Sequence, residues 1–221
     1  MSLKNLFALG IATIALGVDL YAAQIYVVNG NANAAEPYDS KDNAAASIQA
    51  AINYATDGDE IIVAKSEEAY ASFTLSKAVT VRGETGNFHD VVVIGSNNEA
   101  NNITISSSGA VLSSITATGG LRCFYNSGGG TITNCYATGG NPAVKQNGSG
   151  HGIYNNNGKV LDSVIDGCRS SDHFAGIGYY QTGANALGDR LTITNNYANQ
   201  TFGNWSGENK NTDFGAPGAA I

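Results

Sequence analysis

Charged side chains, and basic ones above all, are scarce in this chain. Only 13% of the 221 residues are charged, and 11 Lys and Arg face 18 Asp and Glu, a formal net charge of −7. Nucleic-acid binding relies on many basic residues that neutralise phosphates, so we expect no nucleic-acid partner. The negative surface also repels acidic polysaccharides unless metal ions bridge the two.

A hydrophobic run long enough to cross a membrane is also missing. The longest apolar run, residues 6–18, follows Lys4, is shorter than the roughly 20 residues of a spanning helix, and is followed by Asp19. It precedes Tyr21-Ala22-Ala23, which suits a cleavage site. We therefore expect residues 1–23 to be a signal peptide rather than a membrane anchor, and the mature chain to be secreted or on the cell surface without a membrane span.

Cysteine is rare, with three residues, Cys123, Cys135 and Cys168, at irregular spacing. Such spacing does not make a metal site, and an odd number leaves at least one thiol unpaired in an exported chain. We expect small buried side chains that fill the core. A Cys123–Cys135 bridge is the alternative.

Glycine, by contrast, is abundant, with 28 residues, and 43% of the chain is hydrophobic, which together favour a turn-rich all-β protein over a disordered one. A short phrase repeats: "AVLSSITATGG", "GTITNCYATGG", "KVLDSVIDGCR" and "DRLTITNNYA". Its closing residues, Gly119, Gly139, Gly167 and Asn195, are spaced by 20, 28 and 28 residues. Short strands between Gly and Asn turns at this period indicate a parallel β-helix, a solenoid, with an antiparallel sandwich as the competing architecture.

Stacked coils should place similar residues at the same position. The alignment groups Cys135 with Ser163 and Leu191, and Ala137 with Ile165 and Ile193. Asn134 and residues 195–196 fall at turns, where a stacked amide bonds along the axis.

The first part of the chain differs from the repeats. Ile48, Ala51, Ile52 and Ala55 recur at helical spacing, and an Asp-Gly-Asp turn then leads into an apolar strand at 61–63. We expect one domain over 24–221. It has an N-terminal helix and turn over 41–58 that cap the first coil, coils over 59–200, and an irregular tail or incomplete coil over 201–221.

This N-terminal segment resembles the start of right-handed parallel β-helix proteins of the pectate-lyase-like superfamily. The resemblance rests on Ile48, Ala51, Ile52, Ala55, Gly58, Asp59, Ile61, Val63, Tyr70, Leu75, Val79, Val81 and Gly83. It implies the right-handed fold with an amphipathic capping helix. It says little about chemistry, because the superfamily includes lyases, hydrolases, esterases, adhesins and phage tailspikes.

Enzymes of the superfamily act on polysaccharides in a groove on the outer face of the coils. The candidate catalytic residues are therefore the charged ones between the phrases: Asp162, Asp166, Arg169, Asp189 and Arg190, with Asp172 and His173 nearby. Asp162 and Asp189 could stack on one face and share calcium, or Arg190 could neutralise them instead.

A polygalacturonase-like set is present only in fragments. Gly150-His151-Gly152 occurs, but Asn211-Thr212-Asp213 follows it where the family order has it first, and we read both as chance matches. Aromatic residues are more informative, because rings beside turns can stack on sugars. The candidate ligand-binding residues are Tyr154, Tyr179, Tyr180 and Trp205, and strand alternation should send Tyr179 and Tyr180 to opposite faces.

Few acid and base groups favour a non-catalytic, adhesin-like surface module without a cofactor, which binds polysaccharide or another surface protein. The alternative is a lyase of the pectate-lyase type that acts on acidic polysaccharide with calcium. Since the tail has no clear cap, we also expect end-to-end self-association or further coils of a longer chain.

Overall fold

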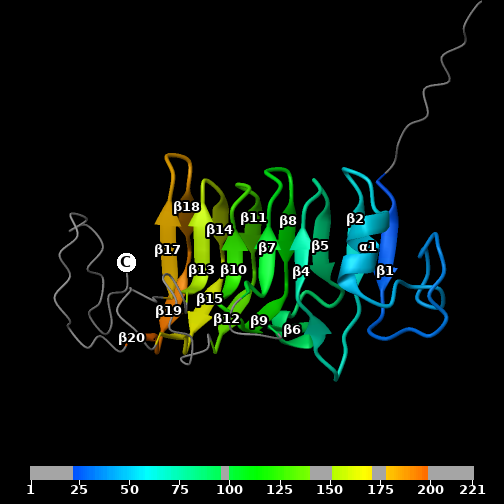
Figure 1. Ribbon diagram of the computed structural model, residues 1–221, viewed down its shortest axis with the longest axis horizontal. Helices are drawn as coiled ribbons and strands as arrows, with labels where there is room; N and C mark the ends of the chain where they lie inside the picture. The colour runs from blue at the N-terminus through cyan, green and yellow to red at the C-terminus, as the bar shows by residue number, and fades with distance from the viewer. Residues whose placement is uncertain (1–21, 96–99, 140–150, 171–177, 199–221) are drawn as a thin grey trace, which may run out of the picture.

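The computed structural model describes residues 22–95, 100–139, 151–170 and 178–198 (Figure 1). Almost all of the expected signal peptide and the whole tail over 201–221 lie outside these residues. The described part is nearly all β, with one α-helix, α1 (Ile48–Tyr54), and one 3-10 turn, η1 (Phe88–Asp90). Among the described residues, no helix has the length and apolar character needed to span a bilayer.

The strands of the described residues form three long sheets and one short pair. Sheet A contains β1 (Gln24–Val27), β2 (Glu60–Val63), β5 (Thr80–Gly83), β8 (Val111–Ser113), β11 (Thr131–Thr133), β14 (Lys159–Leu161) and β18 (Leu187–Asp189). Sheet B contains β3 (Tyr70–Ala71), β6 (Val92–Gly95), β9 (Thr116–Gly119), β12 (Tyr136–Thr138), β15 (Val164–Asp166) and β19 (Thr192–Thr194). Sheet C contains β4 (Phe73–Leu75), β7 (Ile103–Ile105), β10 (Arg122–Asn126), β13 (His151–Asn156) and β17 (Tyr179–Thr182), while β16 (Arg169–Ser170) pairs with β20 (Tyr197–Ala198).

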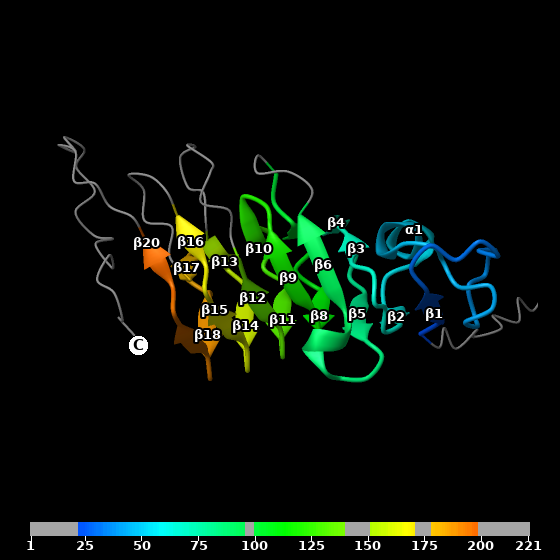
Figure 2. The same ribbon diagram turned by 90° about the horizontal axis from the view of Figure 1, so that it is seen from below.

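From β2 onward the chain visits sheets A, B and C in turn, and we call each such circuit a coil. Every strand pair in the described residues is parallel, for example β12 with β9 and β15. This excludes the antiparallel sandwich and fits the predicted parallel β-helix. The three sheets run side by side along the long axis of the molecule (Figures 1 and 2).

Strand register confirms the repeat read from the sequence. Ala137 lies opposite Ile165, which lies opposite Ile193. The closing residues of the phrases, Gly119, Gly139, Gly167 and Asn195, all have positive φ, between 51° and 76°. Glycine and asparagine tolerate this left-handed backbone better than other residues, so their recurrence at this turn has a steric cause.

Columns of apolar side chains fill the space between the sheets. In sheet A, Val81, Leu112, Ile132 and Val160 follow one another and are completely buried. Full burial of such a side chain contributes roughly 1.5–3 kcal/mol relative to exposure. The core is therefore continuous from coil to coil, and it holds each sheet in one register because a one-residue slip would expose the column.

A second turn with left-handed backbone lies between sheets A and B, and its residues are not glycine. Its residues are Ser114, Asn134, Asp162 and Arg190, with φ of 58°, 47°, 49° and 52°. Asn134 Nδ2 donates to Ser114 Oγ of the preceding coil at 3.0 Å, which confirms the predicted axial amide bond. This turn places Asp162 and Arg190 at equivalent positions of adjacent coils.

The helix α1 lies at the N-terminal end of the stack, beside β4 (Figure 2). It begins at Ser47, whose side chain accepts a hydrogen bond from the Ala50 N–H at 3.2 Å. Its apolar side, Ile48, Ala51 and Ile52, is buried as predicted.

The three cysteines are free thiols and are buried in the core, as expected. Cys123 Sγ contacts the Thr138 carbonyl oxygen at 3.3 Å, whereas Cys135 Sγ contacts the Thr133 carbonyl oxygen at 3.3 Å. The alternative Cys123–Cys135 bridge is therefore absent. Burial raises the pKa of the Cys135 thiol to about 12, so this group is an inert filler at neutral pH.

Candidate functional site

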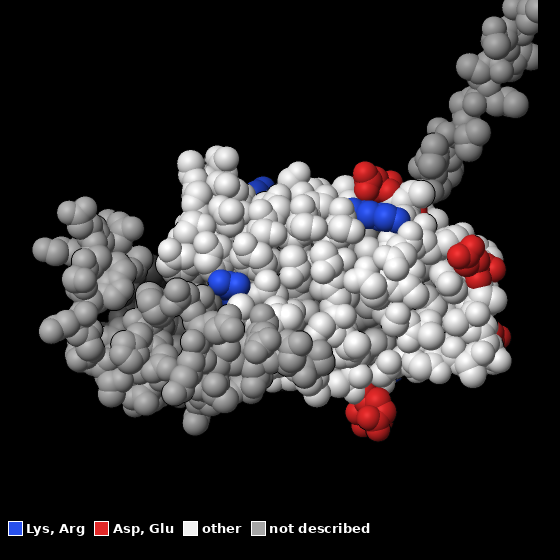
Figure 3. Space-filling model, viewed as in Figure 1, with Lys and Arg blue, Asp and Glu red and all other residues white. Residues whose placement is uncertain are grey.

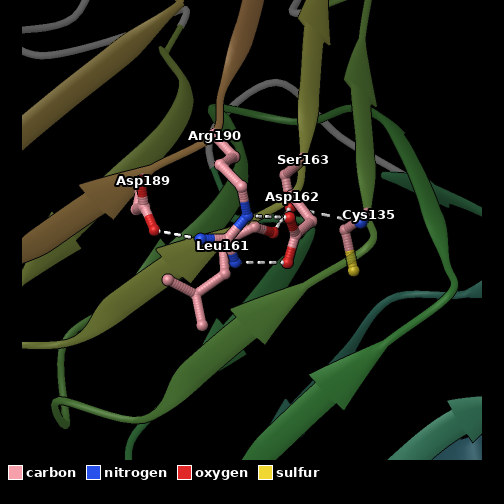
Figure 4. Close-up of polar contacts among 6 residues, drawn as sticks. All are labelled: Cys135, Leu161, Asp162, Ser163, Asp189 and Arg190. Atoms are coloured by element: carbon pink, nitrogen blue, oxygen red, sulfur yellow. Dashed lines mark hydrogen bonds and ion pairs between the residues drawn. The ribbon is translucent and has the colours of Figure 1, made fainter.

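The predicted charged cluster contains a compact ion-paired group, which we call the charged turn: Asp162, Asp189 and Arg190. Figure 4 shows the Arg190 guanidinium between the two carboxylates, with Ser163 and Cys135 on the side of Asp162. Arg190 Nη2 donates to Asp162 Oδ2 at 2.8 Å, Nε also contacts Asp162, and Nη1 contacts Asp189. Register places Asp189 opposite Leu161, one residue before the position of Asp162, in agreement with the alignment of Ser163 with Leu191.

The charged turn is exposed, with 60% of the Arg190 side chain and 45% of the Asp162 side chain accessible. The hydrogen bond from Arg190 is the main cause that lowers the pKa of the Asp162 carboxyl. Solvent screens such pairs, and exposed ion pairs contribute little stability. Arg190 thus neutralises the two carboxylates that the sequence suggested for calcium.

Asp166, another candidate, belongs to a separate group on sheet B. Its carboxylate accepts hydrogen bonds from Asn195 Nδ2 at 2.8 Å, Thr194 Oγ1 at 2.9 Å and Tyr136 Oη at 3.0 Å. These bonds, that of Asn195 first, lower the pKa of Asp166. Asp166 therefore accepts hydrogen bonds from the preceding coil, which contains Tyr136, and from the following coil, which contains Thr194 and Asn195.

The other charged candidates add little to a shared site. The Arg169 backbone lies in β16, Asp172 and His173 lie outside the described residues, and nothing is assigned to their side chains. Among the described residues, no group of three or more His, Cys, Asp and Glu side chains is placed to hold a metal ion. His151 is buried in β13, with its ring 5.8 Å from that of Tyr154 and 5.4 Å from that of Tyr180.

The aromatic candidates give a more ordered arrangement on the outer face of sheet C. Tyr125, Tyr154 and Tyr180 lie opposite one another on β10, β13 and β17, and we call them the tyrosine strip. The ring centroids of Tyr125 and Tyr154 are 5.2 Å apart, and those of Tyr154 and Tyr180 are 5.0 Å apart. All three side chains are partly exposed, so the strip continues for three coils along the axis.

Tyr179 does not belong to the strip, which confirms that Tyr179 and Tyr180 point to opposite faces. Tyr179 lies opposite the buried Ile153 and packs against the core. Its Oη donates to Gln181 Oε1 at 2.6 Å and accepts from Asn155 Nδ2 at 3.2 Å. Burial raises the pKa of Tyr179. Trp205, the last aromatic candidate, lies outside the described residues.

Arg122, at the start of β10, lies against the tyrosine strip. It was not among the candidate residues predicted from the sequence. Its Cζ lies 4.9 Å from the ring centroid of Tyr125 and 5.1 Å from that of Tyr154, within the range of cation–π attraction. Nη1 donates to Asn101 Oδ1 at 3.0 Å. Burial lowers the pKa of Arg122, opposed by Tyr125 and Tyr154.

Figure 3 shows this face toward the viewer, where a small basic patch over β10 and β13 has uncharged described atoms around it. The sequence did hold a clue to the arrangement. "RCFY" at 122–125 and "HGIY" at 151–154 each place a nitrogen-rich side chain three residues before a tyrosine, one coil apart.

No family model, no curated protein and no solved structure matches this chain. Strand register and burial therefore define the architecture.

Proposed function

We propose that the protein is an exported, non-catalytic surface module that binds glycan through the tyrosine strip. Its fold in this proposal is a right-handed parallel β-helix like those of the pectate-lyase-like superfamily. Right-handedness is supported by the general rule that crossovers between parallel strands of one sheet are right-handed. The N-terminal resemblance supports the same fold, and the apolar run at 6–18 supports export.

In this proposal α1 caps the first coil. Without a neighbour, the outer edge of β4 would expose unpaired backbone groups to another strand. Gln49 on α1 occupies that edge: its Oε1 accepts from the Thr74 N–H at 2.9 Å, and its Nε2 donates to the Thr74 carbonyl at 3.5 Å. The side-chain amide replaces one residue of a missing strand.

The observation that carries the binding proposal is the register of Tyr125, Tyr154 and Tyr180 on three adjacent strands. Aromatic rings offer apolar faces to the C–H faces of sugars, and tyrosine hydroxyls donate to sugar hydroxyls. A rigid sheet holds these side chains at fixed spacing, which reduces the ordering cost of binding. A disordered loop with the same residues would lack this advantage.

Calcium-dependent lyase activity is the alternative, and the geometry favours it less. A lyase needs carboxylates that hold calcium beside a basic residue that removes a proton. Here Asp162 and Asp189 already share Arg190, and Asp166 accepts three hydrogen bonds from its neighbours.

A glycan array probed with residues 24–221 tests the proposal. We expect binding to a defined set of glycans, weakened in Tyr154→Ala and kept in Tyr26→Ala, a control tyrosine on β1 in sheet A. Absence of binding to every glycan would contradict the proposal. Incubation with polygalacturonate or alginate and calcium, followed by absorbance near 235 nm, tests the alternative, because an unsaturated product would show a lyase.

A further inference from the structure

We infer that the glycan bound by the tyrosine strip carries an anionic group, a carboxylate or a sulfate, and that Arg122 binds this group. The inference rests on the proposed function and goes beyond it by naming the chemical class of the ligand. It starts from a comparison among the arginine side chains that the structure describes.

Two of these three arginines are paired with carboxylates of the same chain. Arg82 Nε lies 2.7 Å from Glu60 Oε1, and Arg190 contacts both Asp162 and Asp189. In the described part of the chain, Arg122 has tyrosine rings around it and no carboxylate. Since acidic residues outnumber basic ones 18 to 11, a missing partner is not explained by a shortage of acids.

The hydrogen-bonding capacity of Arg122 is also largely unused. A guanidinium carries five N–H donors in a planar fork. Within the described residues, Nη1 donates to Asn101, and the buried Nε atom has no hydrogen-bond partner. A fork with free donors matches a carboxylate or a sulfate, which accept two parallel hydrogen bonds.

The surroundings increase the benefit of such a partner. Arg122 is partly buried, and a charge withdrawn from water is costly unless it is paired. The rings of Tyr125 and Tyr154 supply only part of the compensation, because a cation–π contact is weaker than a charge-assisted bidentate pair. An anion on the ligand would supply the rest.

The position of Arg122 brings the stacking of a sugar ring and the pairing of its anionic group into one binding site. The guanidinium lies against the rings of Tyr125 and Tyr154, so a sugar stacked on the strip brings its substituents next to Arg122. The net charge of −7 repels acidic polymers from most of the surface, which concentrates their binding at this locally positive face.

Calorimetric titration of residues 24–221 with matched glycans tests the inference. The probes are β-1,4-linked and α-1,6-linked glucose tetrasaccharides, each in a neutral form, a carboxymethylated form and an O-sulfated form. We expect an anionic form to bind at least about 10-fold more tightly than its neutral parent, since a charge-assisted pair exceeds 1.4 kcal/mol. Carboxymethylated and sulfated arms identify which anion Arg122 prefers.

The variants assign the preference to one side chain. Arg122→Gln should lose the preference for anionic forms, Arg122→Lys should keep part of it, and Arg190→Gln should keep it fully. Equal binding of neutral and anionic forms, or a preference that survives in Arg122→Gln, would overturn the inference while leaving glycan binding intact. No binding of any form would count against the inference and the proposed function together, and thermal melting of each variant excludes unfolding as the cause.

Discussion

The tyrosine strip and the charged turn each contain an arginine, and the two arginines have opposite surroundings. Arg190 is exposed and satisfied by Asp162 and Asp189, so the charged turn is complete without a ligand. Arg122 is partly buried against Tyr125 and Tyr154, and its Nε has no hydrogen-bond partner among the residues that the structure describes. A dense charged cluster is therefore a weaker indication of a binding site than one charge without an opposite partner.

The tyrosine strip, unlike the charged turn, lies over a large core side chain. Removal of that side chain should give the largest effect on stability. Phe124 is completely buried beneath the strip, between Ile103 and Ile153. We expect Phe124→Ala to lower the free energy of unfolding by about 3–5 kcal/mol through the lost contacts and the cavity. Urea denaturation measures this change, and Arg190→Gln at the exposed turn is the control that should change it little.

The strip itself should matter for binding far more than for folding. Tyr154 contacts the rings of both neighbours, so Tyr154→Ala removes the centre of the stacking surface. We expect glycan affinity to fall about 10-fold, roughly 1.4 kcal/mol, with little change in melting temperature. Asp162→Asn in the charged turn should leave the affinity unchanged, and an equal loss there would erase the distinction between the regions.

Acid should weaken the ion pair of the charged turn. The hydrogen bond from Arg190 lowers the folded pKa of Asp162 below its ordinary value of 3.8. The stability that this carboxylate contributes is therefore present above that value and is lost as the pH falls through the lower folded pKa.

Melting temperatures at pH 6 and pH 3 measure this small effect. The wild type should lose slightly more stability between the two pH values than Asp162→Asn, which has no carboxylate to protonate. Asp42→Asn, in the N-terminal part of the chain, is the control and should behave as the wild type does. An unchanged or larger loss in Asp162→Asn would mean that the Arg190 pair does not stabilise the fold.

A reducing agent should leave the stability of the protein unchanged, which is the smallest of the expected effects. All three cysteines are completely buried: Cys123 lies in β10, Cys135 directly before β12, and Cys168 between β15 and β16. All three are free thiols, and each Sγ contacts a backbone carbonyl oxygen: that of Thr138 for Cys123, Thr133 for Cys135 and Ala137 for Cys168. The denatured, unreduced protein should show three free thiols, and a count of one would contradict this arrangement.

Much of the fold was predictable because its rules are local and repeated. The turn residues Gly119, Gly139 and Gly167 fix the period, and the alternation at Ala137 fixes which side faces the core. The start of α1 was predictable for the same reason, since Ile48, Ala51 and Ile52 have helical spacing. The competing antiparallel sandwich differs in strand pairing, which short-range patterns do not encode.

The site was harder to predict because it depends on register between coils of unequal length. Tyr125 and Tyr154 are 29 residues apart, and Tyr154 and Tyr180 are 26 apart, so they do not share the spacing of the phrases. Stacking of Asp162 and Asp189 on one face around calcium was one expectation and neutralisation by Arg190 the other; Asp189 is paired with Leu161, and Arg190 lies at the position equivalent to Asp162. A difference of one residue in register decides whether two carboxylates face each other across a metal ion or face an arginine side chain.

Hydrogen–deuterium exchange with and without the glycan selected on the array tests the central claim most directly. It reports which backbone segments a ligand covers without altering any side chain. We predict slower exchange over β10, β13 and β17, the strands of the tyrosine strip, and unchanged exchange in peptides that contain Asp162, Asp189 and Arg190. Protection confined to the charged turn, with no change over those three strands, would contradict the account.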